Sequence, residues 1–477
     1  MAAARRRTPR SRPGVTGGSE PQSGGWSRAW ERARRPGSFT RDVGVLGTGT
    51  TLAQVVTIGV LPVLSRLYTP AQFGMFGLFM SCLSIGGLLS AGSYERAILL
   101  PAEEREAAGV FGVAMLVALL TAGLGMIAVA LVGPAFSAAL GTPALSGWLY
   151  WLPVGTLVIG VSEALKYWAG REQRFSLIGR ARAIQMTATA AAQVALGAVR
   201  PMGGGGLILG RVGGIGLLAV LLGGPTWGRL GQALRSLPAR AYVGAAARFK
   251  KFPQFVTGSA VFSQAASAAP IFIIALNFPG DTVGQFAMIQ RLLSAPMQLI
   301  GDAFEQVFFQ RGSAEQQRTG SPRESVERTF LYLLLLIVVP VVILLGLGRD
   351  LMVLVLGHPW DGAGRMAVWM APLLGLSFVT APLYPVFNLR ERQELQFGFQ
   401  AARIVLALGT VHLVGRATHD IRTTLLAYVA VECLMQLAAL TVAFRLAGAS
   451  PAGVVRRGSA LWKAIRHHPA GGTSQGQ

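Results

Sequence analysis

Charged side chains interrupt one apolar stretch of the chain, VGQFAMIQRLLSAPMQLIGDAFEQVFFQR, residues 283–311. At about 100° per residue, the polar residues in it fall within roughly 60° of arc on one side of a helix. These residues are Arg291, Ser294, Gln298, Asp302 and Glu305. A charge at the bilayer centre costs about 2.5–3.5 kcal/mol even on the gentler insertion scales. The stripe is therefore expected to face protein or a water-filled cavity.

The expected role of each charged residue depends on its depth in the membrane. Arg291 lies deep in the predicted span, about 16 Å along the helix from Asp302, so we expect a functional role for it. Asp302 and Glu305 lie near the helix end, where a side chain can reach water at little cost. A structural role is favoured for both, with gating or coupling as the alternative.

Other predicted spans add polar side chains. Gln54 and Gln264 lie in the first and seventh spans, and Arg211 lies in a glycine-rich span, where it either packs against a carbonyl or lines a cavity. Glu432 is the most isolated carboxylate, a candidate for proton coupling or a neutral hydrogen-bonded acid. Arg403 is expected to extend to the cytoplasmic surface. Because guanidinium groups match phosphate oxygens, this set of residues favours an anionic ligand.

Neither a metal site nor a cofactor site is predicted. The two cysteines, Cys82 and Cys433, lie in apolar runs, and the five histidines form no cluster at ligand spacing. The glycines at 203–206 and the GTGTT sequence near the first span lack the strand and helix context of a phosphate-binding loop.

The composition indicates a membrane protein. Of the 477 residues, 52% are hydrophobic and 13% are charged, whereas a soluble domain carries about 25% charged residues. Apolar runs of about 20 residues recur, long enough to cross the hydrocarbon core as helices. We predict an all-α polytopic fold with about twelve transmembrane helices. They are expected near 43–64, 73–92, 107–133, 145–168, 183–199, 205–224, 253–277, 283–309, 329–347, 364–388, 396–415 and 423–446.

The distribution of basic residues predicts the orientation. About 33 of the 43 lysines and arginines fall in the two tails and in alternate loops. The opposite loops hold Arg66, Arg200, Arg349, Arg365, Arg416 and Arg422. Both termini are therefore expected to be cytoplasmic, and the net charge of +22 indicates membrane orientation rather than nucleic-acid binding.

An internal repeat is predicted from the sequence shifted by 210 residues. The matching pairs are Gln54 with Gln264, Gly74 with Gly284, Phe76 with Phe286, Leu83 with Leu293, Ser84 with Ser294 and Glu95 with Glu305. They fall in corresponding spans, which favours two six-helix bundles related by a pseudo-two-fold axis along the membrane normal.

Five regions are expected along the chain. Residues 1–42 form a basic, disordered cytoplasmic tail without a signal peptide, and 43–224 form the N-terminal bundle. Residues 225–252 form a basic polar linker, 253–446 the C-terminal bundle and 447–477 a cytoplasmic tail. A second polar connection is expected at 310–328.

Several segments resemble the polysaccharide or O-antigen flippase family of the multidrug/oligosaccharidyl-lipid/polysaccharide exporter superfamily. They are LPVLSRLYTPAQFGMFGLF at 61–79, SYERAILLP at 93–101, RFKKFPQF at 248–255 and the segment at 283–311. The similarity extends from about residue 40 to 446. The arginine-rich N-terminal arm departs from the family pattern.

The resemblance implies a twelve-helix exporter of the bacterial cytoplasmic membrane that works by alternating access and makes no covalent bond. Its substrate would be a polyprenyl-pyrophosphate-linked glycan, and its partners would be membrane lipids and polysaccharide polymerase and assembly proteins. Arg291 and Arg211 would serve a cationic cavity. The other polar residues expected in that cavity are Gln54, Gln264, Gln298 and Ser294. Arg66 matches a junction residue and has a structural or gating role.

Two other functions remain open at this stage. A cation-coupled multidrug exporter of the same superfamily should have a cavity dominated by carboxylates, whereas cations are at least as prominent here. A membrane polymerase or glycosyltransferase usually presents its catalytic residues on a large outer loop, and the outer loops predicted here are short and poor in charge.

Overall fold

The computed structural model describes residues 56–199 and 202–466, and all regular structure in these ranges is helical. The predicted basic tail at 1–42, Gln54 and most of the first span lie outside the described residues. The N-terminal half contains α3 (Leu61–Leu67), α4 (Pro70–Ser90), α5 (Tyr94–Ala97), α6 (Glu104–Ala139), α7 (Leu145–Trp148), α8 (Trp151–Arg171), α9 (Phe175–Ala198) and α10 (Gly205–Arg235).

The second half begins with a short surface helix and a π-helical turn. It contains α11 (Ala239–Arg248), η2 (Phe252–Thr257), α12 (Gly258–Asn277), α13 (Gly280–Thr319), α14 (Arg323–Leu356), η3 (His358–Trp360), α15 (Asp361–Thr380), η4 (Ala381–Leu383), α16 (Pro385–Leu389), α17 (Gln393–Thr418), α18 (Ile421–Leu446) and α19 (Pro451–Arg466).

The helices account for the predicted membrane spans. Among the described residues, nine helices are long and apolar enough to cross a membrane. The 24-residue α9 and the 40-residue α13 are also long enough but carry more polar residues. Together with the first predicted span, of which the structure describes the part from residue 56, they make up the predicted twelve. The protein is a multi-pass membrane protein of all-α architecture.

The two polar connections expected from the sequence are largely helical. The predicted linker at 225–252 contains the end of α10 and all of α11, and Tyr242 of α11 donates a hydrogen bond to the Leu234 carbonyl (2.9 Å). The connection expected at 310–328 shrinks to the turn at residues 320–322, where Gly320 has a φ of 76°. Polar residues beyond the bilayer can continue a helix, because water satisfies the hydrogen-bonding groups of their side chains. Hydropathy alone therefore does not show where such a helix ends.

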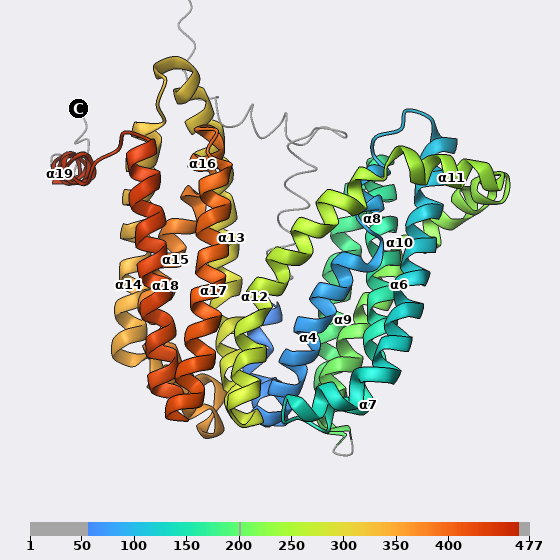
Figure 1. Ribbon diagram of the computed structural model, residues 1–477, viewed down its shortest axis with the longest axis horizontal. Helices are drawn as coiled ribbons and strands as arrows, with labels where there is room; N and C mark the ends of the chain where they lie inside the picture. Colours follow the sequence, from blue (N-terminus) through green and yellow to red (C-terminus); the bar gives the residue numbers. More distant parts are fainter. Residues whose placement is uncertain (1–55, 200–201, 467–477) are drawn as a thin grey trace, which may run out of the picture.

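Two helical bundles meet at one end and separate at the other (Figure 1). A hydrophobic core shared by both halves includes Leu64, Phe79, Phe286 and Trp360 and lies at the end where they meet. At the opposite end each half has its own core: the N-terminal core contains Phe111, Trp168 and Phe249 among others, and the C-terminal core contains residues such as Phe308 and Phe387. The molecule is therefore closed at one end and open at the other.

The two halves share their closest helix contact between α4 and α13. A Cβ atom at Gly74 would collide with the Gly280 carbonyl, and one at Gly284 would collide with the Pro70 carbonyl. These two contacts are related by the 210-residue shift of the predicted repeat. A Cβ at Gly77 would likewise lie 2.7 Å from that of Ala287, its equivalent. Equivalent positions face one another, as they must where a pseudo-two-fold axis passes between equivalent helices.

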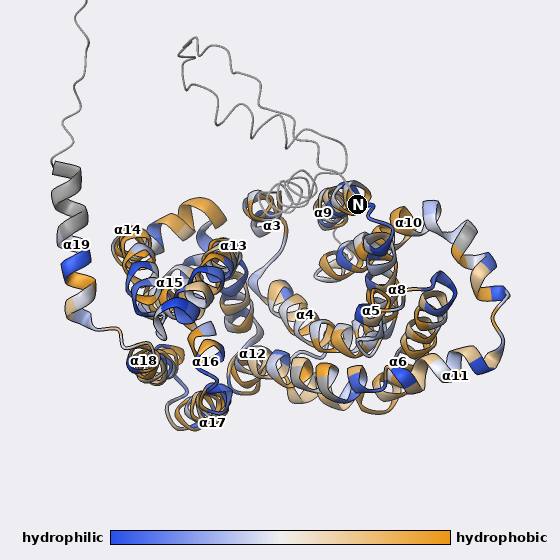
Figure 2. Ribbon diagram, turned by 90° about the horizontal axis from the view of Figure 1, so that it is seen from above, coloured by the Kyte–Doolittle hydropathy of each residue, from blue (hydrophilic) through white to orange (hydrophobic). Residues whose placement is uncertain are grey.

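Seen from above, α12 lies between the two groups of helices, and α11 and α19 lie at opposite edges (Figure 2). The expected C-terminal tail thus includes a helix, α19. Arg457 of α19 donates to the buried Glu327 of α14 (2.9 Å), which also accepts from Arg323 (3.1 Å). This ion-pair network holds the first turns of α19 against the C-terminal bundle.

Candidate functional site

A cavity of about 550 Å³ lies between the two halves. Its walls come from α4, α9 and α10 of the first half and from α12 and α13 of the second. The polar or charged side chains that line it are Thr57, Ser81, Ser84, Thr189, Gln193, Arg211, Gln264, Ser267, Gln290 and Arg291. The shared hydrophobic core adjoins this cavity, because Phe73, Phe76 and Ile271 belong to both.

Two arginines from different halves face this cavity. Arg211 comes from α10, and Arg291 comes from α13, where its guanidinium carbon lies 5.6 Å from the centre of the Phe76 ring. The Nε atom of Arg211 and an Nη atom of Arg291 are buried and donate no hydrogen bond within the described part of the chain. Because an unpaired buried donor costs about 1–3 kcal/mol, and more when charged, these groups are suited to an anionic ligand.

Glycines bring Arg211 to the cavity. Cβ atoms at Gly210 and Gly214 of α10 would collide with Gln193 and Thr189 of α9, so the two helices pack at a distance that only glycine permits. Of the two roles left open for Arg211, the structure supports the one in which it lines a cavity.

Amide and hydroxyl groups surround the two cations. Gln264 of α12 donates to the Ser84 hydroxyl of α4 at 3.0 Å, which joins the two halves across the cavity. Gln193 is fully buried and donates to the Leu207 carbonyl at 2.9 Å. Gln193, Gln290 and the aromatic contact of Phe76 were not identified from the sequence, because no spacing rule links them to Arg291.

The cavity is cationic. No Asp or Glu is found among the described residues that line it. Arg182, an exposed residue of α9, lies close enough to Arg211 for their charges to interact. This proximity was not predicted, because hydropathy places Arg182 in a loop before the fifth span.

Glu432 lies in a separate cavity of about 210 Å³ inside the C-terminal half. The expectation that it is isolated is wrong, because its carboxylate lies 3.7 Å from the half-buried side chain of Arg403. Gln436 donates to Ser377 and accepts from Thr380, both at 2.8 Å. The small cavity shares Ser267 and Gln290 with the central one, so the two adjoin.

The remaining candidate residues fall elsewhere. The side chains of Ser294, Gln298 and Asp302 lie outside the described part of the structure, as does Gln54. Glu305 is exposed on α13 and lines neither cavity. Arg66 is exposed and donates to the Pro62 carbonyl one turn earlier in α3 at 3.1 Å.

A strained turn joins the first half to the beginning of α12. Ser93 adopts a left-handed conformation with φ of 57°, and its buried hydroxyl lies 2.9 Å from that of Thr257 in the π-helical turn η2. In the following helix α5, burial raises the pKa of the Glu95 carboxyl, with Arg96 4.0 Å away. Left-handed non-glycine residues and π-helical turns are often found at functional sites.

The described residues contain no group of three or more His, Cys, Asp or Glu side chains that could hold a metal ion. What the central cavity offers is therefore two guanidinium groups beside amides and hydroxyls.

Comparison with known proteins gives a family and a fold. A family model described as "Polysaccharide biosynthesis protein" matches residues 63–364. No curated protein matches the chain. An inward-facing multidrug resistance MATE family transporter of the MOP superfamily shares 14% identity at a TM-score of 0.63, over 83% of this chain and 95% of that one. The lipid II flippase MurJ, in an inward closed conformation, shares 9% identity at a TM-score of 0.65, over 86% of this chain and 89% of that one.

Proposed function

Since the chain belongs to the polysaccharide biosynthesis protein family, we propose that it is a membrane flippase for lipid-linked oligosaccharides. Its substrate is a polyprenyl-pyrophosphate-linked repeat unit, which it moves from the cytoplasmic to the outer leaflet of a bacterial cytoplasmic membrane. Translocation forms and breaks no covalent bond, so the protein acts as a transporter and not as an enzyme.

The pair of half-buried arginines in the central cavity carries this proposal. A pyrophosphate brings two phosphoryl groups with several acceptor oxygens, and each guanidinium presents N–H donors in a planar fork that matches them. Arg211 and Arg291 have unpaired buried donors in one cavity. Binding of a pyrophosphate would satisfy those donors and offset the repulsion between the two cations.

The surrounding amides and hydroxyls suit a sugar. Glycan hydroxyls donate and accept hydrogen bonds, as do Gln193, Gln264, Gln290 and Ser84 on the cavity wall. The hydrogen bond from Gln264 to Ser84 connects the two halves, so a sugar that replaced it would loosen this contact and favour their relative movement.

The shape of the molecule supports alternating access. The positive-inside rule places the basic loops, and with them the open end, at the cytoplasm. The substrate head group would then enter from the leaflet on which it is assembled. Glu432 and Arg403 adjoin the cavity and are proposed to couple the movement of the halves to an ion or proton gradient.

Export of cationic drugs is the second candidate, because the fold is shared with a multidrug resistance transporter. The charge of the cavity disfavours it. A cationic drug would be repelled by Arg211 and Arg291, and Glu432 is paired with Arg403.

The test is depletion of the protein in its host, complemented with variants of the two arginines. We expect Arg291→Ala and Arg211→Ala to reduce glycan export by roughly 10- to 100-fold, the effect of removing one charged hydrogen-bond partner. Lysine variants should retain part of the activity, because the charge remains. The measurement is mass spectrometry of polyprenyl lipids together with their exposure on each leaflet.

Arg416→Ala is the control, because this arginine is exposed and lies outside the cavity. Full export by Arg291→Ala at wild-type protein levels would refute the pyrophosphate role. An unchanged lipid pool with altered sensitivity to cationic dyes would favour drug export instead.

A further inference from the structure

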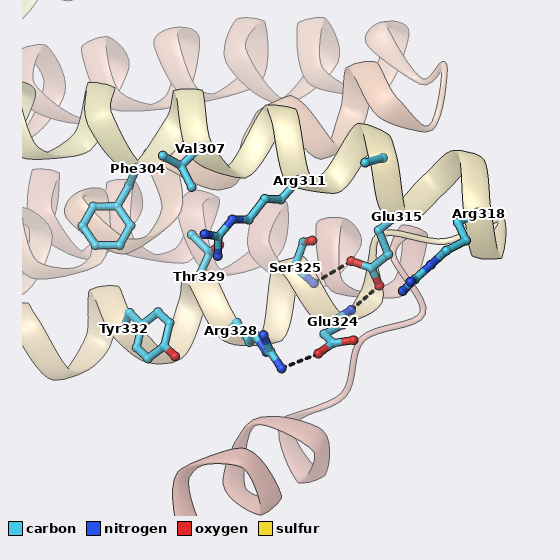
Figure 3. A pocket seen from close by; sticks show the side chains of 11 residues that line it. Phe304, Val307, Arg311, Glu315, Arg318, Glu324, Ser325, Arg328, Thr329 and Tyr332 are labelled. Carbon is cyan, nitrogen blue, oxygen red and sulfur yellow. Dashed lines mark hydrogen bonds and ion pairs between the residues drawn. The ribbon is translucent and has the colours of Figure 1, made fainter. Parts of the chain in front are cut away.

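A third cavity, of about 530 Å³, lies between the ends of α13 and α14 (Figure 3), at the open end of the molecule (Figure 1). Its lining shares no residue with the central cavity. One wall is the part of α13 from Phe304 to Arg318, and the other is the part of α14 from Glu324 to Tyr332. We refer to it as the α13–α14 groove.

Helical spacing aligns the lining residues along the groove. Phe304, Arg311 and Arg318 are spaced by seven residues, so they lie on the same face of α13 at successive heights. Arg328 and Tyr332 are four residues apart on α14 and face them. Figure 3 shows Phe304 and Tyr332 together at one end and the charged residues toward the other.

The groove therefore changes from apolar to cationic along its length. Phe304, Val307 and Tyr332 line the end nearer the middle of the membrane. The end nearer the turn at 320–322 carries Arg311 and Arg318 of α13. A phospholipid has the same order, with acyl chains toward the bilayer centre and a phosphate at its surface.

The acidic residues of the groove are already engaged. The carboxylate of Glu315 accepts hydrogen bonds from the backbone N–H groups of Glu324 and Ser325 (2.7 and 2.8 Å), which caps the beginning of α14. Glu324 pairs with Arg328 at 2.6 Å and with Arg457 of α19 at 3.3 Å.

Two cations of the groove have no ion-pair partner among the described residues. Neither Arg311 nor Arg318 forms a hydrogen bond or ion pair with a described residue, and both are exposed. Their two guanidinium groups lie two helical turns apart on one face of α13. The apolar part of the groove continues from them toward the middle of the membrane.

The apolar end of the groove continues onto a surface suited to lipid. Tyr332, Leu335 and Val339 follow one another at helical spacing on α14 and are 44%, 54% and 61% exposed. In both ribbon views α14 lies at the outer edge of its bundle (Figures 1 and 2). The groove thus opens toward the bilayer rather than toward the central cavity.

We propose that the α13–α14 groove binds an anionic phospholipid of the cytoplasmic leaflet. Arg311 and Arg318 hold the phosphate of the head group, and Phe304, Val307 and Tyr332 contact the upper part of an acyl chain. Basic pockets between transmembrane helices on the cytoplasmic side are known to bind anionic head groups. The proposal depends on the membrane orientation of the chain and not on what the central cavity transports.

The experiment measures binding of phosphatidylglycerol and phosphatidylcholine to the purified full-length protein by native mass spectrometry. The double variant Arg311→Gln/Arg318→Gln removes the two free charges. Arg235→Gln/Arg240→Gln removes two exposed arginines from α10 and α11, outside the groove, and serves as the control with equal net charge.

We expect the wild type to prefer phosphatidylglycerol, and the groove variant to bind it roughly thirtyfold more weakly, because each of the two arginines contributes about 1 kcal/mol near the membrane surface. The control variant should match the wild type, and Arg311→Lys/Arg318→Lys should retain most of the preference. Binding of phosphatidylcholine should be the same in all variants. Unchanged thermal unfolding without added lipid confirms that each variant is folded.

An unchanged preference for phosphatidylglycerol in the groove variant would overturn the proposal. So would an equal loss in the control variant, because the preference would then reflect diffuse charge. Since binding is measured without transport, the result is independent of the function of the central cavity.

Discussion

At the scale of single residues, the buried charges fall into two kinds. Arg211 and Arg291 keep unpaired donors beside a cavity and have no acidic neighbour among the described residues of its lining. Arg403 also has an Nε without a hydrogen bond in the described part of the chain, but it lies 3.7 Å from the carboxylate of Glu432. Glu327 accepts from two arginines and the Ser450 N–H. A buried charge is tolerated when it is paired or faces a polar cavity. The unpaired kind is therefore the better indicator of a ligand site.

The Arg403–Glu432 pair can be tested by a double-mutant cycle. Arg403→Met and Glu432→Gln alone should each lower thermal stability, because either leaves its partner without the opposite charge. The cost should be below the roughly 3–5 kcal/mol of a fully buried pair, since Arg403 is half-buried. The double variant should regain most of that stability. If the pair couples transport to an ion gradient, the double variant will be folded but will not export glycan. Normal export by the folded double variant would show that the pair is only structural.

At the scale of the elements, apolar run length located the membrane helices but not their ends. α13 continues to Thr319 and α10 to Arg235, beyond the predicted spans. The repeat also acquires a physical meaning here. Gly74 and Gly284, matched in the sequence, are the positions at which α4 and α13 approach each other most closely.

We predict that Gly74→Ala lowers the melting temperature of the detergent-solubilised protein by several degrees. Overpacking of this kind lowers the free energy of unfolding by about 1–3 kcal/mol. The added methyl group would collide with the Gly280 carbonyl and lie 2.9 Å from the Gly284 nitrogen, and backbone atoms cannot rotate away. Gly409→Ala in α17 is the control, because a Cβ atom added at Gly409 would meet no neighbouring segment within 4 Å. Equal melting temperatures for the two variants would contradict this account of the interface.

At the scale of the whole molecule, one shared core and two separate cores define the closed and open ends. Trp360 of η3, in the second half, is fully buried at the closed end. Its indole N–H donates to the Ser65 carbonyl of the first half (2.9 Å), and its ring lies 5.2 Å from that of Phe73 in an edge-to-face contact. This side chain joins the two halves where alternating access requires them to separate.

Thiol labelling can report which end is open. In a background with Cys82 and Cys433 replaced by alanine, Ser267→Cys should react with a membrane-impermeant reagent from the cytoplasmic side, because Ser267 is exposed in the central cavity. Adding Trp360→Ala should make the same cysteine react from the outer side, since loss of a buried tryptophan costs about 3–5 kcal/mol at the seal. Labelling of Ser267→Cys from outside in the presence of Trp360 would refute the assignment of the closed end.

The sequence by itself determined the class of the protein, its membrane spans and the cationic character of its interior. These properties follow from the composition of continuous segments, because hydropathy and charge at membrane depth are local quantities. The repeat and the orientation are also predictions from the sequence alone. In the structure, the repeat corresponds to the contact of Gly74 with Gly284 between α4 and α13.

The tertiary structure decided most of the contacts between polar residues. The family resemblance alone assigned Arg211 and Arg291 to one cavity; nothing in their spacing does so, whereas helix packing brings the two halves together around them. The partner of Glu432, the seal formed by Trp360 and the cationic groove between α13 and α14 are likewise products of packing. The reason is physical: a sequence gives the periodicity of each helix face, but the rotation of each helix against its neighbours depends on contacts between segments that are distant in the chain.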